Sequence, residues 1–130
     1  MHGIAAARME WERLTELYVV ERKKGSRTYK DDFRRFGDAI ALLEWGSERC
    51  TISKLEALVL KDGAATRLLK LLQGISDEYD VPLWGNVIPY DPARPVDGTA
   101  PIAQDELEAL YLKIGFRLHR GLDVVECFYP

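Results

Sequence analysis

Helical spacing of apolar residues marks the first part of this chain. Such residues recur every three or four positions between residues 5 and 22, as on one face of an amphipathic helix: Trp11, Leu14, Leu17 and Tyr18. Basic residues and a glycine follow at positions 22–27, which is typical of a helix end. We therefore predict a first helix over residues 5–22, with the basic run as its solvated end.

Two later segments have the same periodicity. In residues 64–79 the apolar face consists of Leu68, Leu69, Leu72, Ile75 and Tyr79, and Asp80 follows directly. In residues 104–114 the apolar face consists of Leu107, Leu110, Tyr111 and Ile114. We predict a helix over each of these two segments, and the helix over 64–79 has the clearest pattern.

Other segments favour β-strands. Residues 38–45 and 50–57 are two apolar runs separated by a short turn, so we predict a hairpin. A helical face of Phe33, Phe36, Ile40 and Leu43 is the alternative for part of this region, and the pattern leaves residues 28–37 unassigned. We also predict a strand over 81–88 and a closing hairpin of 116–119 with 124–128.

The order of these elements predicts the fold class. A strand, a helix and a strand follow one another in residues 50–88, which requires a right-handed parallel crossover. Residues 89–103 contain four prolines and one glycine and are predicted to be a long loop. We expect an α/β fold of the mixed α+β kind, with a central mixed sheet flanked by helices, in a single domain over residues 1–130.

The composition limits the classes of partner that the protein can bind. The chain has 130 residues, a formal net charge of −3 and 47% hydrophobic residues, which is typical of a globular protein. The acidic balance argues against a nucleic-acid partner and tolerates a basic acceptor such as an amine. No apolar run approaches the ~18 residues that span a bilayer, and the N-terminus lacks a secretion pattern. We therefore expect a cytoplasmic protein, with Cys50 and Cys127 as reduced strand residues.

The turn before the second helix has the chemistry of an anion site. Gly63 can adopt any backbone conformation, and Ala64 and Ala65 leave room for a close approach. Thr66 could add a hydroxyl donor, while Lys61 and Arg67 add positive charge to that of the helix N-terminus. A plain strand-to-helix turn is the alternative interpretation of this stretch.

Two side chains could transfer protons. Tyr111 could protonate a leaving group, or it could be an ordinary core tyrosine on the apolar face of its helix. Glu56 could orient or deprotonate an amine if burial raises its pKa, or it could be an outward-facing charge of its strand. His2 and His119 show no metal-ligand spacing, so we predict no metal site.

These residues together resemble the GNAT N-acetyltransferase superfamily. Leu60-Lys61-Asp62-Gly63-Ala64-Ala65 is similar to the family's loop pattern Q/R-x-x-G-x-G/A, and Leu68-Leu69 follows at the expected distance. Leu110-Tyr111-Leu112-Lys113-Ile114-Gly115-Phe116 matches the family's Tyr-x-x-x-Gly-Phe pattern. The resemblance covers residues 38–130, and residues 1–37 form an atypical N-terminal segment. Leu60 departs from the usual Gln or Arg.

The resemblance implies a GNAT-like acyl-CoA N-acyltransferase fold and a direct transfer of acetyl from acetyl-CoA to a primary amine. It implies Tyr111 and Glu56 as catalytic residues and one group of cofactor-binding residues: Leu55, Glu56, Ala57, Lys61, Asp62, Gly63, Ala64, Ala65, Thr66 and Arg67. The acceptor would be a small amine, a protein lysine or an N-terminus. The resemblance leaves a homodimer open.

The same resemblance suggests an alternative without catalysis. The spacing is closest to compact, phage-type members of the family, some of which act on proteins of the opposing host or phage defence. A GNAT scaffold can keep its shape after its chemistry is lost, because a fold does not determine a function. The alternative is a phage-encoded protein of the host cytoplasm that binds and inhibits a host enzyme.

Overall fold

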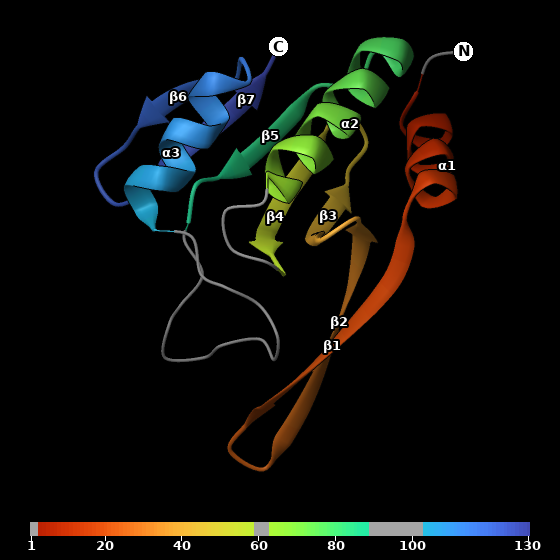
Figure 1. The fold of residues 1–130 in the computed structure, drawn as a ribbon, viewed down its shortest axis with the longest axis vertical. Coiled ribbons are helices and arrows are strands. Elements are labelled where there is room, and N and C mark those ends of the chain that lie inside the picture. The colour runs from red at the N-terminus through yellow and green to blue at the C-terminus, as the bar shows by residue number, and fades with distance from the viewer. Residues whose placement is uncertain (1–2, 59–62, 89–102) are drawn as a thin grey trace.

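The computed structural model describes residues 3–58, 63–88 and 103–130 (Figure 1). Within them the chain forms three helices and a seven-stranded sheet with the order β1-β2-β3-β4-β5-β7-β6. The elements are α1 (Ile4–Leu14), β1 (Glu16–Lys24), β2 (Arg27–Phe36), β3 (Ala39–Trp45), β4 (Cys50–Ala57), α2 (Ala64–Tyr79), β5 (Leu83–Asn86), α3 (Gln104–Lys113), β6 (Arg117–Arg120) and β7 (Val125–Tyr129). The predicted mixed sheet with flanking helices is confirmed.

The middle and the C-terminal part follow the sequence pattern. Helix α2 covers the predicted range 64–79 and ends at Asp80, whose φ of 57° is left-handed. The N–H of Val81 then donates to the carbonyl of Ser76, which closes the last turn. Helix α3 ends one residue before the predicted bound, and β6 and β7 form the predicted closing hairpin. The predicted loop 89–103 lies outside the described residues apart from Ala103.

The prediction of a helix over residues 5–22 is wrong beyond Leu14. Thr15 is extended, and its hydroxyl donates to the carbonyl oxygen of Trp11 at 2.6 Å. The guanidinium of Arg34 donates to the carbonyls of Glu12 and Thr15 at 2.8 and 2.6 Å. A cation from a distant strand thus satisfies the last carbonyls of α1, and the chain turns away at that point.

Residues 16–36 form a long antiparallel hairpin instead. Pairing runs from Glu16 with Arg35 to Lys24 with Arg27, and Gly25 has a left-handed φ of 65° in the turn. Leu17, predicted on a helix face, is a 57% exposed strand residue. Phe33 and Phe36 lie in β2 and Ile40 in β3, so the helical alternative for residues 33–43 does not form.

The central strands have the predicted connections. β3 and β4 pair antiparallel across the turn at residues 46–49, and β4 and β5 pair in parallel. Helix α2 is the connection between the two parallel strands. This arrangement places the first turn of α2 next to the C-terminal end of β4, as in other strand–helix–strand units.

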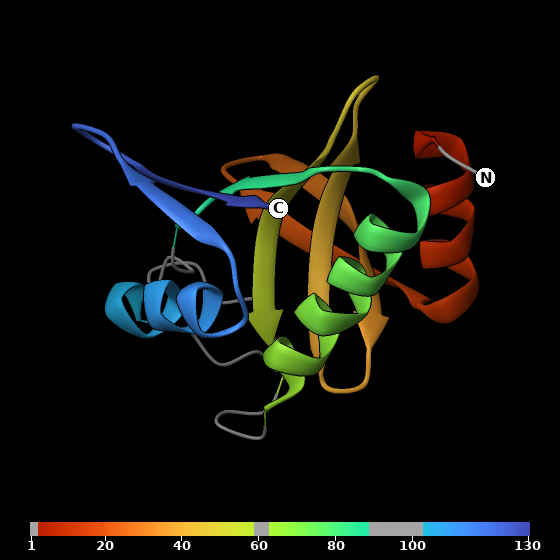
Figure 2. The same ribbon diagram turned by 90° about the horizontal axis from the view of Figure 1, so that it is seen from above.

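Two apolar clusters hold the sheet. The main core combines residues of all three helices with the sheet, including Trp11, Leu68 and Leu107. A smaller cluster of Val20, Phe33 and Ile40 joins β1, β2 and β3. Helices α1 and α2 lie side by side, while α3 lies apart from them beside β6 (Figures 1 and 2). In the described ranges we find no helix of the length and apolarity needed to cross a membrane.

Candidate functional site

Strands β4 and β5 pair only at their beginnings. Their ladder consists of Cys50 with Leu83, Thr51 with Trp84, and Ile52 with Gly85. Beyond Ile52, β4 continues to Ala57 without a β5 partner among the described residues. Figure 2 shows β5, in teal, leading away toward α3 while β4 continues toward the first turn of α2. Five of the eight residues of β4 therefore lack a pairing with the described part of β5, and we call these residues, 53–57, the split segment.

A register shift between β3 and β4 reverses the faces on which the side chains of the split segment lie. Ile52 pairs with Leu43 and Lys54 pairs with Leu42, so Ser53 is an extra residue of β4. Ile52 and Leu55 consequently both belong to the main core, although three positions separate them. Lys54 and Glu56 point to the other face, because they pair with Leu42 and Ile40 of the smaller cluster.

The first turn of α2 has the features of an anion site. Gly63 precedes the helix with a left-handed φ of 80°, and the first turn contains no acidic residue. A β-carbon on Gly63 would lie 3.2 Å from Nη1 of Arg67, so the guanidinium lies over the glycine. The charge of Arg67 adds to the positive potential of the helix N-terminus, and both favour an anion at this position.

The other predicted residues of this turn have distinct surroundings. The methyl groups of Ala64 and Ala65 are buried in the main core, and Thr66 is half-buried. Ala64 and Ala65 are buried as whole residues, at 2% and 7% exposure, so Thr66 and Arg67 are the residues of the first turn that reach solvent. The predicted contributions of Lys61 and Asp62 lie outside the described residues.

Glu56 is buried rather than an outward-facing charge. It is 3% exposed and pairs with Ile40 in β3. On the same face, the Nζ atom of Lys54 lies 3.5 Å from Oδ2 of Asp31 in β2, and both side chains are partly buried. This ion pair was not predicted, because Asp31 lies in residues 28–37, which had no assigned structure. Tyr29, Phe33 and Phe36 stand four and three positions apart, so β2 lacks the alternation that indicates a strand in a sequence.

Tyr111 lies in the main core with 2% exposure. Its ring meets that of Phe116 edge-on, with centroids 5.0 Å apart and planes at 73°. Burial, and to a lesser degree the neighbouring Cys127 thiol, raises the pKa of Tyr111 well above its ordinary value. Cys127 pairs with Gly85, whose neighbour in β4 is Ile52. Tyr111 is thereby connected to the point where the β4–β5 ladder ends.

The predicted site residues lie on both faces of the sheet. Tyr111, Leu55, Ala64 and Ala65 belong to the main core, around the first turn of α2 and the end of the ladder. Glu56 lies in the same strand as Leu55 but on the other face. A group bound along the edge of the split segment would meet both faces, because neighbouring side chains of a strand alternate.

The two cysteines lie in strands, as predicted. Cys50 and Cys127 are free thiols at 0% exposure in β4 and β7. Burial raises the pKa of each thiol to about 12. A thiol of such a high pKa forms little thiolate, so neither cysteine has the properties of a nucleophile.

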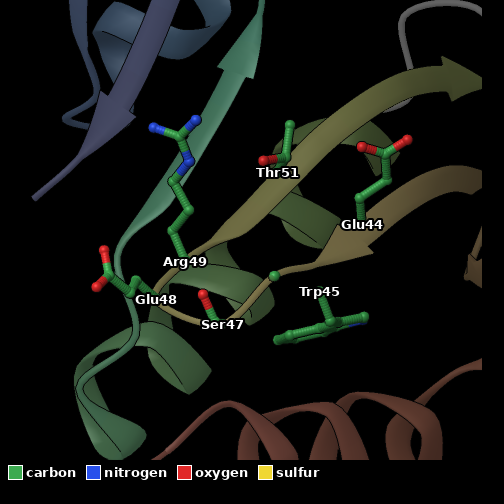
Figure 3. Close-up of a pocket in the computed structure, with 7 residues that line it drawn as sticks. Glu44, Trp45, Ser47, Glu48, Arg49 and Thr51 are labelled. Carbon is green, nitrogen blue, oxygen red and sulfur yellow. The ribbon is translucent and has the colours of Figure 1, made fainter.

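Two surface cavities lie away from the split segment. The larger, of about 590 Å³, surrounds the β3–β4 turn (Figure 3). Its residues include Trp45, on the side of α1, and Arg49, whose guanidinium stacks 3.9 Å from the ring centre of Trp84. A second cavity, of about 210 Å³, lies between α1 and β2. Neither cavity contains a residue of the predicted site.

The absence of a metal site stays a prediction. Within residues 3–58, 63–88 and 103–130, no group of three or more His, Cys, Asp or Glu side chains is arranged to hold an ion. His119 is an exposed residue of β6.

Comparison with known proteins supports the fold alone. No protein-family model and no curated protein matches the sequence. One solved structure that is similar is the crystal structure of the anti-CRISPR protein AcrVA5. The TM-score is 0.55 at 15% sequence identity, and the match covers 71% of this chain and 92% of that chain. This chain therefore shares a fold with AcrVA5 over most of the length of that protein.

Proposed function

We propose that this protein is an N-acetyltransferase that passes an acetyl group from acetyl-CoA directly to a primary amine. The observation that carries the proposal is the early end of the β4–β5 ladder at Ile52 and Gly85, with the first turn of α2 at the open side. An extended pantetheine arm could pair with residues 53–57 on the side of β4 where the described part of β5 no longer pairs, as an added strand would.

The first turn of α2 would bind the diphosphate of CoA. Its main-chain N–H groups and the helix dipole favour negative charge, and Gly63 allows a close approach. Arg67 would pair with a phosphate oxygen. Gly63, Thr66 and Arg67 are the positions of this turn that reach solvent, so the phosphates would approach from their side.

Two residues would handle protons. Glu56, buried beside the edge of β4, would accept the proton that the amine loses as it attacks the thioester. A main-chain N–H of the split segment would stabilise the oxyanion. The departing thiolate would take a proton from Tyr111, whose raised pKa ensures that the phenol is protonated at neutral pH.

The test is release of the free CoA thiol from acetyl-CoA. The protein is mixed with acetyl-CoA and, in turn, a polyamine, a lysine-containing peptide and a peptide with a free N-terminus. The proposal predicts release that requires both the protein and one of these amines, with an acetylated product seen by mass spectrometry. Binding of acetyl-CoA without release for any amine would contradict catalysis.

The second candidate is a phage-encoded protein that inhibits a host enzyme by binding it. The observation in its favour is the shared fold with a protein named as an anti-CRISPR. Arg67→Glu separates the two candidates, because it removes the positive charge at the proposed diphosphate site. An inhibitor that acts by binding alone would still inhibit the host enzyme in this variant. An acetyltransferase would lose acetyl transfer from acetyl-CoA.

A further inference from the structure

The outer part of the β1–β2 hairpin stands away from the body of the molecule (Figure 1). β2 pairs with β3 only through Arg34, Arg35 and Phe36, so the preceding residues form a two-stranded ribbon. Val20 and Phe33 anchor the base of the ribbon in the smaller cluster. Every described side chain from residue 22 to residue 30 is exposed, and we call this segment the arm.

The charge of the arm is opposite to that of the whole chain. Residues 22–30 contain five basic residues and no acidic one, in a chain whose formal net charge is −3. Lys23 and Lys30 are exposed; Lys30 lies opposite Glu21 in the register, and Arg27 pairs with Lys24 beside the turn. Within the described residues, Lys23, Arg27 and Lys30 take part in no ion pair.

The positive charges of the arm lower the stability of the ribbon unless a bound anion neutralises them. A two-stranded hairpin has little stability of its own, and like charges on opposite strands repel each other. Residues 22–30 contain five basic residues and no acidic one, and the nearest acidic residue in the register is Glu21, opposite Lys30 at the base of the arm. A polyanion that binds the arm would remove this repulsion.

We propose that the arm binds double-stranded nucleic acid through its phosphates. The major groove of DNA admits a two-stranded β-ribbon, and basic side chains on both strands of the ribbon can reach the phosphates of both walls. Tyr29, 46% exposed among the basic residues, adds an aromatic surface for sugar or base contact. The expectation of no nucleic-acid partner came from the charge of the whole chain, which conceals the charge of the arm.

The contact is to the backbone, so binding depends on salt and little on sequence. The test uses a fluorescent DNA duplex of arbitrary sequence and anisotropy between about 50 and about 200 mM salt. Wild type is compared with the double variant Lys23→Ala, Lys30→Ala. The matched control is Lys70→Ala, Lys113→Ala, which removes two exposed lysines from α2 and α3.

The arm variant should bind about tenfold more weakly at low salt, with a salt slope about 1.8 smaller because two phosphate contacts are gone. The control variant should bind like wild type. Thermal midpoints should be unchanged in both, since all four lysines are exposed. Absence of duplex binding by wild type at low salt would overturn the proposal, as would equal loss in the control. Binding of polyglutamate as tight as that of the duplex would also overturn it, because an acidic protein would then be the partner.

Discussion

Gly85 lies so close to Ile52 that any side chain at this position would force the end of the β4–β5 ladder to shift. A β-carbon on Gly85 would lie 2.9 Å from the carbonyl oxygen of Ile52 and 3.3 Å from the sulfur of Cys127. The two strands are thus in tight contact at their last pair and separate directly afterwards. The proposed acetyl-CoA site depends on this contact as its closed end.

The close contact predicts the effect of a methyl group at this position. Gly85→Ala should destabilise the fold by roughly 1–3 kcal/mol, because main chain cannot move aside as a flexible side chain can. Gly74→Ala is the matched control. Gly74 lies in α2 with open space around it, so alanine should stabilise the helix by about 0.5–1 kcal/mol. Denaturant unfolding measures both, and equal stability of the two variants would show that the β4–β5 contact tolerates a side chain.

Tyr111→Phe tests the proposed acid. The substitution keeps the ring that packs against Phe116 and removes only the hydroxyl. Acetyl transfer should slow by about 10²–10⁴-fold, while the affinity for acetyl-CoA should remain near that of wild type. Steady-state kinetics and calorimetric binding supply the two numbers. An unchanged rate would leave Tyr111 as a core residue only.

Glu56→Gln tests the proposed base. The amide has the shape of the carboxyl group but accepts no proton from an amine, so turnover should fall by about 10²-fold or more with acetyl-CoA affinity retained. Glu44→Gln is the control, since Glu44 is an exposed glutamate of the neighbouring strand β3. If both variants turn over at the wild-type rate, another group removes the proton.

The buried thiols predict how stability responds to alkaline pH. Burial raises the pKa of Cys50 to about 12, so the folded state retains the proton more strongly than the unfolded state. The resulting stability is fully present below pH ~9 and decreases as the pH rises toward ~12. In Cys50→Ala the free energy of unfolding should fall less steeply over this interval. The slope is the readout, because the cavity left by alanine lowers stability at every pH; an unchanged slope would contradict the raised pKa.

Local patterns were sufficient for the elements that bury one continuous face. The helix over 64–79 was predictable from Leu68, Leu72 and Ile75, whose spacing has no strand interpretation over that length. The hairpin of β3 and β4 was predictable from two apolar runs across a short turn.

The N-terminal region could not be predicted in this way. Leu14, Leu17 and Tyr18 keep helical spacing by coincidence, since the helix ends at Leu14, where Arg34 binds its final carbonyls. That contact joins residues about twenty positions apart and has no local signature. The strand β1 is selected by its pairing with β2, which a single-sequence pattern does not reveal.

The candidate site was predictable only where its residues are neighbours in the sequence. The small residues around Gly63 stand in one short stretch, so their chemistry is visible in the sequence. The face on which Glu56 lies depends on the extra residue Ser53, which inverts the alternation of β4. The ion pair of Asp31 with Lys54 depends on the same inversion and on the unpredicted strand β2.

The most direct test of the central claim is calorimetric titration of acetyl-CoA into wild type, Gly63→Val and Gly37→Val. Both glycines have positive φ, 80° and 61°, so each valine imposes a similar strain of about 1–3 kcal/mol. The account predicts binding by wild type and Gly37→Val and none by Gly63→Val, with all three proteins folded. No binding by folded wild type, or normal binding by Gly63→Val, would contradict the claim that the first turn of α2 holds the diphosphate of CoA.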